Sequence, residues 1–120
     1  MAGEVVHFEV PAKDVDRAQR FYSELFGWEF APSQMPDLDY RMTRINDKAG
    51  AAVFPSENVT GHSNYYHDVE DMDAALAKVR ELGGSAEDKA PVPGFGWFAA
   101  CADSEGNALH LWQADSSAGQ

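Results

Sequence analysis

The stretch at residues 14–27, DVDRAQRFYSELFG, decides the fold because a similar stretch, DMDAALAKVRELGG, stands at residues 71–84. The offset between the two is 57 residues and aligns Asp14 with Asp71. In both stretches an acidic N-cap candidate precedes apolar residues at three-and-four spacing, and glycine ends the pattern, which predicts an amphipathic helix. A strand-like run precedes each helix and three follow it. We therefore expect two βαβββ modules whose curved mixed sheets enclose a cleft lined by equivalent positions of both.

Alternation of apolar residues, interrupted by turn formers, predicts the strands. We expect them at residues 5–10, 28–30, 40–45 and 51–54 in the first half, and at 64–69, 85–90, 97–102 and 108–113 in the second. Strands and helices in this order indicate the α+β class. We expect a single domain over residues 1–120, consisting of module one (5–55), a connector (56–63), module two (64–113) and a tail (114–120) that is disordered from residue 116.

Each predicted helix has one apolar face, which we expect to be buried against its sheet. In the first helix this face consists of Val15, Ala18, Phe21, Tyr22, Leu25 and Phe26. In the second helix it consists of Met72, Ala75, Leu76, Val79 and Leu82.

Composition excludes several classes of protein. Twenty acidic and nine basic residues give a formal net charge of -11, which argues against nucleic acids and anionic membrane surfaces as partners. The charge is compatible with a cationic ligand, although a solubilising surface is the commoner explanation. Cys101 is the only cysteine, so neither a disulfide framework nor a cysteine-based metal site is expected. The N-terminus lacks a signal-peptide pattern and no run is apolar enough to span a membrane, so we expect a cytoplasmic location.

Strand parity separates the side chains that face the cleft from those that pack under a helix. In the first strand, His7 and Glu9 face the cleft. Adding the offset of 57 to His7 gives Asn64, which shares its strand face with Tyr66. In the last strand, His110 faces the cleft.

Trp112 has the parity of His110 and therefore also faces the cleft. Subtracting the same offset from His110 gives Val53 in the first half. Four repeat-related positions are thus expected to line the cleft: His7, Val53, Asn64 and His110.

Three segments resemble a known superfamily. They are residues 7–22 (HFEVPAKDVDRAQRFY), 68–84 (DVEDMDAALAKVRELGG) and 103–113 (DSEGNALHLWQ). The chain resembles the vicinal oxygen chelate superfamily, which includes glyoxalase I, bleomycin-resistance proteins, fosfomycin-resistance enzymes and extradiol dioxygenases. The resemblance covers about residues 5–113 and implies the glyoxalase/bleomycin-resistance fold. It leaves the activity open, because this scaffold carries many functions.

In metal-dependent members of the superfamily, the first and last strands of the paired modules hold one divalent ion. The resemblance therefore implies a metal set of His7, His110 and Asn64, with Zn, Fe, Mn or Ni as the ion. His7 matches the pattern, Asn64 stands where histidine is common, and His110 stands where glutamate is usual. Val53 cannot coordinate a metal, so a protein without a metal is the alternative.

Other cleft positions are candidates for binding and catalysis. Glu9 and Tyr66 are candidates for moving a proton. The alternative for Glu9 is a solvated strand residue without a function, and the alternative for Tyr66 is a ring that only packs. Tyr66, Trp97 and Trp112 are candidates for binding a planar ligand, although large aromatic residues more often fill cores.

Three functions remain open at this point. The first is a metal-dependent lyase, isomerase, transferase or dioxygenase. The second is a metal-free protein that sequesters a small molecule, as drug-resistance proteins do. The third is a domain without turnover. The resemblance also implies a homodimer, in which the modules pair within or between chains.

Overall fold

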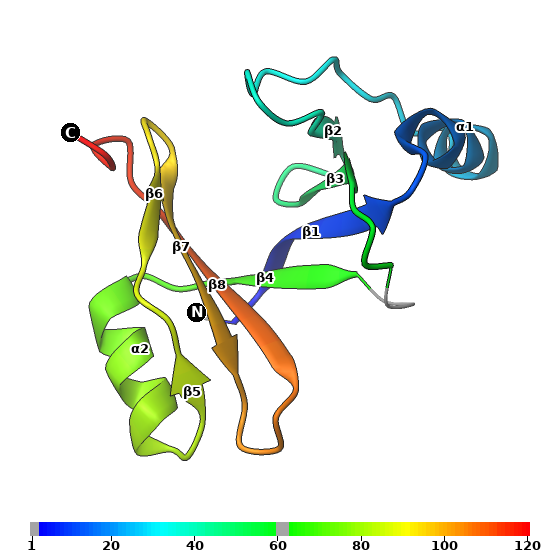
Figure 1. Cartoon of the computed structure of the whole chain (residues 1–120). Helices are drawn as coiled ribbons and strands as arrows, with labels where there is room; N and C mark the ends of the chain where they lie inside the picture. Colours follow the sequence, from blue (N-terminus) through cyan, green and yellow to red (C-terminus); the bar gives the residue numbers. More distant parts are fainter. Residues whose placement is uncertain (1–2, 60–62) are drawn as a thin grey trace. The chain divides into compact units, whose positions relative to one another are not determined.

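The computed structural model describes residues 3–59 and 63–120 (Figure 1). Residues 60–62 of the predicted connector lie outside the described part. The chain forms two compact units, which we call the first unit (residues 6–64) and the second unit (residues 1–5 and 65–120). The fold class is α+β, as predicted, and the elements follow the chain as β1 (Val5–Ala12), α1 (Val15–Phe26), β2 (Arg41–Arg44), β3 (Gly50–Pro55), β4 (Asn64–Asp68), α2 (Met72–Glu81), β5 (Ser85–Ala86), β6 (Ala90–Val92), β7 (Gly96–Ala102) and β8 (Ala108–Ala114).

In the first unit, β3 pairs with two neighbours. It runs parallel to β1, with His7 opposite Gly50 and Glu9 opposite Ala52. It runs antiparallel to β2, with Met42 opposite Ala52. An irregular segment, residues 27–40, connects α1 to β2.

α1 begins and ends as its sequence predicts. The side chain of Asp14 accepts a hydrogen bond of 3.0 Å from the backbone N–H of Arg17, and Gly27 ends the helix with φ 77°. The helix covers one face of β1 and β3, where Val15 packs with Ala12 and Val53. Parity in β1 is therefore as predicted, because Ala12 points to the helix.

The predicted apolar face of α1 is only partly buried. Phe21, Leu25 and Phe26 are 59%, 59% and 56% exposed, so the prediction that they belong to the core is wrong. The helix contacts its core through Val15, Ala18 and Tyr22, and these positions leave Phe21, Leu25 and Phe26 on its flank.

The predicted strand at residues 28–30 does not form. The aromatic ring of Trp28 packs instead with those of Tyr22 and Phe26, at centroid distances of 5.6 and 4.9 Å. The segment contacts β2 through a hydrogen bond of 2.9 Å from Ala31 N–H to the Met42 carbonyl. Side-chain packing of the aromatic residues thus outweighs their strand propensity.

In the second unit, β8 lies between β4, to which it is parallel, and β7, to which it is antiparallel. The predicted hairpin is confirmed, and Asp103 holds its turn by accepting hydrogen bonds from the N–H groups of Glu105 and Asn107. β5 and β6 pair with successive parts of β7. Of the strand predicted at 85–90, only residues 85–86 and 90 are in strands, and β6 continues to Val92.

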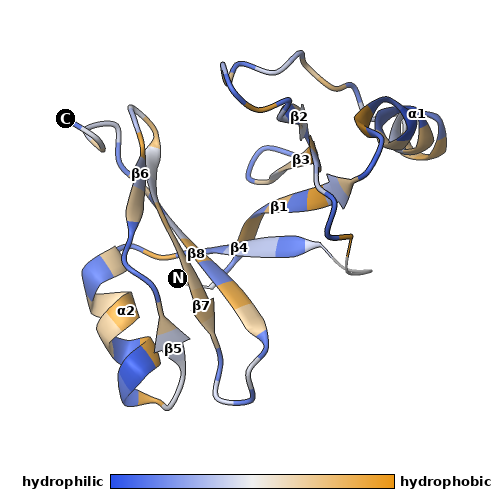
Figure 2. Ribbon diagram, in the orientation of Figure 1, coloured by the Kyte–Doolittle hydropathy of each residue, from blue (hydrophilic) through white to orange (hydrophobic). Residues whose placement is uncertain are grey.

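α2 covers one face of this sheet. Its core contains Met72, Leu76, Ala99, Cys101 and Leu111. In Figure 2 both helices show hydrophilic and hydrophobic segments in turn along their length, as expected of amphipathic helices. In the part of the chain that is described, no helix is long and apolar enough to cross a membrane.

The tail is ordered, so the prediction of disorder from residue 116 is wrong. Ala118 is fully buried, and its carbonyl accepts a hydrogen bond of 3.0 Å from Gly94 N–H. Asp115 starts the turn, because its carboxylate accepts hydrogen bonds from Ser117 N–H and from the indole N–H of Trp97. These long-range contacts are not visible in a polar terminal sequence.

The N-cap of α2 gives a testable prediction. The Asp71 carboxylate accepts a hydrogen bond of 3.1 Å from Ala74 N–H, so Asp71→Ala should lower the free energy of unfolding by about 1 kcal/mol. Urea unfolding measures this change. Asp71→Ser restores an N-cap oxygen and should recover most of the loss; equal destabilisation by both variants would contradict a capping role.

Candidate functional site

A hydrogen-bonded network of three side chains lies on the face of β1 opposite α1. His7 Nε2 lies 2.6 Å from the hydroxyl oxygen of Tyr40, and this hydroxyl donates a hydrogen bond of 2.7 Å to Glu9 Oε2. A tyrosine hydroxyl has one proton, and in Tyr40 this proton forms the hydrogen bond with Glu9. The hydrogen bond between His7 and Tyr40 must therefore use a proton on Nε2 of His7, with the Tyr40 oxygen as the acceptor. His7, Tyr40 and Glu9 form what we call the polar centre.

The polar centre brings together two predicted residues and one that sequence analysis missed. His7 and Glu9 are two positions apart on β1 and share a strand face, as parity predicts. Tyr40 immediately precedes β2 and is 9% exposed. Its flanking charges, Asp39 and Arg41, are the local signal that could have drawn attention to it.

The backbone around Tyr40 is held by hydrogen bonds rather than by a strand. Ser33 Oγ accepts a hydrogen bond of 2.9 Å from Tyr40 N–H and donates one of 2.6 Å to the Leu38 carbonyl. These bonds replace a ladder in the irregular segment and place the phenol over β1.

Arg41 fastens the same segment to α1. Its guanidinium donates two hydrogen bonds to Asp39, at 2.9 and 2.8 Å, one of 2.9 Å to Gln19, and pairs with Asp16 at 2.8 Å. The hydrogen bonds with Asp39 and Asp16 raise the pKa of Arg41. Through these contacts the guanidinium of Arg41 links the segment that carries Tyr40 to α1.

The strand next to the polar centre carries small residues. Gly50 is opposite His7 and Ala52 is opposite Glu9. A Cβ atom at Gly50 would lie 3.9 Å from His7 Nδ1 and 3.1 Å from the Thr43 carbonyl oxygen. A side chain at Gly50 would therefore crowd the backbone of β2 at Thr43, while its distance from the imidazole is an ordinary van der Waals contact.

Burial determines the charge of the imidazole. It lowers the pKa of His7 below 6.5, and the neighbouring charge of Glu9 opposes this shift without cancelling it. The ring is therefore neutral at pH 7, which is the form that donates from Nε2 alone and also the form that binds metals.

The lowered pKa predicts how stability depends on pH. Between 6.5 and the lower folded-state pKa, the unfolded chain binds more protons than the folded one, so the free energy of unfolding falls as the solution is acidified. His7→Gln removes this contribution. Urea unfolding should therefore show that wild type loses more stability than His7→Gln between about pH 8 and about pH 5.5. Equal losses would contradict a neutral buried His7.

In the second unit, His110 and Tyr66 are neighbours. They are opposite each other in the parallel pair of β4 and β8, and their ring centroids are 5.0 Å apart. Trp112 follows on the same face of β8, because the intervening Leu111 packs under α2. Asn64 is the first residue of β4, where the first unit ends.

Trp97 lies elsewhere. It packs on the α2 side of the sheet, next to the core that contains Ala99 and Cys101. Its indole N–H donates a hydrogen bond of 3.0 Å to Asp115, and the ammonium of Lys89 lies 4.4 Å from its ring centroid. This placement does not favour the predicted stacking of Trp97 on a ligand in the cleft and leaves that role to Trp112.

The prediction that Val53 is the counterpart of His110 is wrong. Val53 is buried with Ala12 under α1 and therefore points away from His7 and Glu9. Tyr66 is opposite His110, and its repeat mate Glu9 is opposite Ala52. Ala52 is therefore the true counterpart, and the offset here is 58, because the second half contains one more residue between its first and last strands.

The two units thus provide separate groups: His7, Glu9 and Tyr40 in the first, and Tyr66, His110 and Trp112 in the second. Within the described ranges, 3–59 and 63–120, no three or more His, Cys, Asp or Glu side chains are grouped to hold a metal. The metal set of His7, His110 and Asn64 stays a prediction.

Comparisons with known proteins agree with this architecture. Residues 4–46 match the family described as bleomycin resistance protein-like N-terminal. Among solved structures, methylmalonyl-CoA epimerase from Mycobacterium tuberculosis is similar with a TM-score of 0.71 and 14% identity, over 94% of this chain and 88% of that one. Hypothetical protein BH1468 from Bacillus halodurans is similar with a TM-score of 0.73 and 14% identity, over 98% and 99%. These likenesses show the fold.

Sequence relatives show the family. A glyoxylase-like domain-containing protein from Didymella fabae is 32% identical over 119 residues, which are 88% of this chain and 89% of that protein. A candidate glyoxylase from Mycobacterium bovis, CFP32, is 31% identical over 92% of this chain, but the match covers 46% of its own length. The chain thus spans about half the length of this mycobacterial relative. With these matches and this fold, the chain belongs to the vicinal oxygen chelate superfamily of glyoxalase- and bleomycin-resistance-like proteins.

Proposed function

We propose that this protein is an enzyme that binds a small organic molecule against the polar centre and moves a proton on it. The observation that carries the proposal is the pair of short hydrogen bonds joining His7, Tyr40 and Glu9. A carboxylate and two donors, held within hydrogen-bond reach of one another, are the elements of general acid–base catalysis.

Each member of the polar centre has a role in this proposal. Glu9 accepts a proton from a carbon next to a carbonyl group. Once Glu9 is protonated, the hydroxyl of Tyr40 is released to donate to the oxygen on which negative charge develops, and the Nε2–H of His7 supports that hydroxyl. Tyr66, beside His110 in the second unit, stays a separate candidate for moving a proton.

The substrate class follows from this chemistry. Isomerases and lyases that act beside a carbonyl group need one base and a stabilised oxyanion. Glyoxylase-like relatives and an epimerase of the same fold support this class, because epimerisation is the removal and return of a proton at one carbon.

A divalent metal is compatible with the donors, and we retain it in the proposal. The neutral imidazole of His7, the imidazole of His110 and the amide oxygen of Asn64 would hold Zn, Fe, Mn or Ni. When bound, such an ion would stabilise the oxyanion as a Lewis acid. Because Nε2 of His7 carries a proton in the polar centre, an ion at that nitrogen would require the other tautomer of the ring and loss of the hydrogen bond with Tyr40.

Proton exchange tests the enzymatic proposal. The purified chain is incubated in D₂O with hemithioacetals of 2-oxoaldehydes and with 2-methyl-branched acyl thioesters, and ¹H NMR follows loss of the proton beside the carbonyl. We expect exchange by wild type and a loss of at least about a hundredfold in Glu9→Gln, since general-base catalysis contributes on the order of 10² to 10⁴. Glu29→Gln, on the exposed segment after α1, is the matched control.

A metal-free sequestering protein is the second candidate, favoured by the match of residues 4–46 to a bleomycin resistance protein-like family. Ligand binding in a thermal-shift screen without any proton exchange would support it against the enzyme. Weakened binding in Trp112→Ala would assign the stacking surface. Elemental analysis of protein purified without chelators tests the metal: below about a tenth of an equivalent, unchanged by His7→Ala, would remove the ion from the proposal.

Homodimer formation and a cytoplasmic location, both predicted from the sequence, stay proposals. Sedimentation equilibrium of the full chain measures the first. Fractionation of the source cells measures the second.

A further inference from the structure

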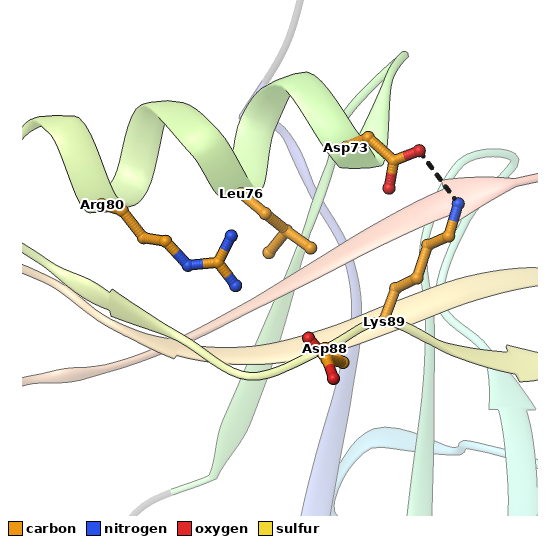
Figure 3. A pocket seen from close by; sticks show the side chains of 5 residues that line it. All are labelled: Asp73, Leu76, Arg80, Asp88 and Lys89. Carbon is orange, nitrogen blue, oxygen red and sulfur yellow. Dashed lines mark hydrogen bonds and ion pairs between the residues drawn. The ribbon is translucent and has the colours of Figure 1, made fainter.

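A surface cavity of about 380 Å³ lies between α2 and the segment joining β5 to β6 (Figure 3). Asp73, Leu76 and Arg80 line it from one face of α2, and Asp88 and Lys89 line it from the segment. It lies wholly in the second unit, on the side of the sheet covered by α2. It is therefore separate from the polar centre and from the face that carries His110.

Two of its four charged side chains neutralise each other. Lys89 Nζ lies 3.2 Å from Asp73 Oδ2, and Figure 3 shows this pair at one end of the cavity. The same ammonium lies 4.4 Å from the ring centroid of Trp97. Because Lys89 already contacts a carboxylate and an aromatic face, it lines the cavity and is not expected to bind a ligand charge.

The other two charges, Arg80 and Asp88, have no counterion among the residues that the structure describes. Arg80 donates one hydrogen bond, from Nη2 to the Ala86 carbonyl at 3.2 Å, out of the five N–H donors of a guanidinium. Across the described residues, neither Arg80 nor Asp88 forms an ion pair, and the Asp88 carboxylate accepts no hydrogen bond. Figure 3 shows both side chains bordering the space beneath α2.

Between the charges the lining is apolar. Leu76 is 5% exposed, and its side chain belongs to the core beneath α2. The cavity therefore presents a guanidinium and a carboxylate to an occupant, with a small aliphatic contact from the exposed edge of Leu76.

We infer that this cavity binds a small zwitterion of the free amino-acid class that carries an aliphatic side chain. The carboxylate of the ligand pairs with Arg80, which suits bidentate recognition of a planar carboxylate. The ammonium group pairs with Asp88, and the side chain contacts Leu76. A volume of about 380 Å³ is at the lower end of known ligand cavities, which suits a molecule of this size.

A ligand with one charge fits less well. A simple carboxylate would meet the uncompensated Asp88 as well as Arg80, in a chain whose net charge is -11. A simple amine would meet the positive charge of Arg80. Only a ligand with both charges satisfies both side chains, so both charges should be needed for binding.

Titration of the full chain with L-leucine tests the inference. We follow the amide signals of Leu76, Ala86 and Lys89 by ¹H–¹⁵N NMR and expect saturable shifts with a dissociation constant of about 1 mM. Isovalerate lacks the ammonium group and leucinamide lacks the carboxylate, so each should bind at least about tenfold more weakly.

Matched variants identify the two charges. Arg80→Gln and Asp88→Asn should each weaken leucine binding by at least about tenfold. Lys78→Gln, a cation of α2 outside the cavity, and Glu87→Gln, beside Asp88, should leave it unchanged. Thermal unfolding establishes that the variants are folded.

Three outcomes would overturn the inference: no saturable shift up to about 50 mM leucine, unchanged binding in Arg80→Gln or Asp88→Asn, or isovalerate binding as tightly as leucine. None of these bears on the polar centre, whose proton-exchange assay uses different ligands and residues.

Discussion

Replacement of Tyr40 by alanine should lower the free energy of unfolding by about 4 kcal/mol, the range found when a buried aromatic ring is removed. Tyr40 is 9% exposed, and its ring centroid lies 6.1 Å from that of His7 and 6.2 Å from that of Phe54. The substitution removes this packing and also the hydroxyl that links His7 to Glu9. Urea unfolding at neutral pH measures the loss.

Tyr40→Phe separates the two contributions. It retains the ring and leaves His7 and Glu9 without the hydroxyl, which should cost about 1 to 2 kcal/mol because buried polar groups then lose a partner. Tyr22→Phe is the matched control, since its ring stacks on Trp28 and Phe26 and its hydroxyl forms no hydrogen bond with the residues that the structure describes. Equal stability of the two phenylalanine variants would show that the Tyr40 hydroxyl contributes nothing.

Met72→Ala should cost about 3 kcal/mol of unfolding free energy, because it leaves a cavity in the core of the second unit. Met72 is fully buried and packs with Leu76, Ala99, Cys101 and Leu111. Thermal or urea unfolding of the full chain measures the change.

The control for this substitution is Met35→Ala. Met35 is 42% exposed, and its loss should change stability by less than about 0.5 kcal/mol. A similar effect of both substitutions would contradict the assignment of Met72 to a closely packed core.

Local signals made much of the fold predictable. Asp14 and Asp71 cap their helices as expected, because an N-cap is formed by residues three positions apart. The hairpin after Gly96 was visible from its turn residues, with Asp103 as the acceptor that holds the turn. Strand parity placed His7 and Glu9 correctly on one face.

Features that depend on side-chain packing, whether with near or distant parts of the chain, were not predictable. Trp28 has high strand propensity, but its ring packs on Tyr22 and Phe26 instead of allowing a strand. Ala118 is buried because the chain end turns back on Gly94, which a short polar tail does not reveal.

The candidate site was predictable only in part. Parity found His7 and Glu9, but Tyr40 reaches them from another segment, through a position that Ser33 and Arg41 stabilise. No spacing rule connects residues 31 to 33 positions apart in an irregular loop.

The one-residue change in offset has a consequence for the comparison of the two halves. At the position equivalent to His110, the first unit has Ala52, which is fully buried and carries no group that could bind a metal or move a proton. The two halves therefore differ in chemistry at this position, and only the second provides an imidazole there. If residues of one half are to be introduced into the other, the equivalent positions should be chosen from the pairing of the strands and not from a constant difference in residue number.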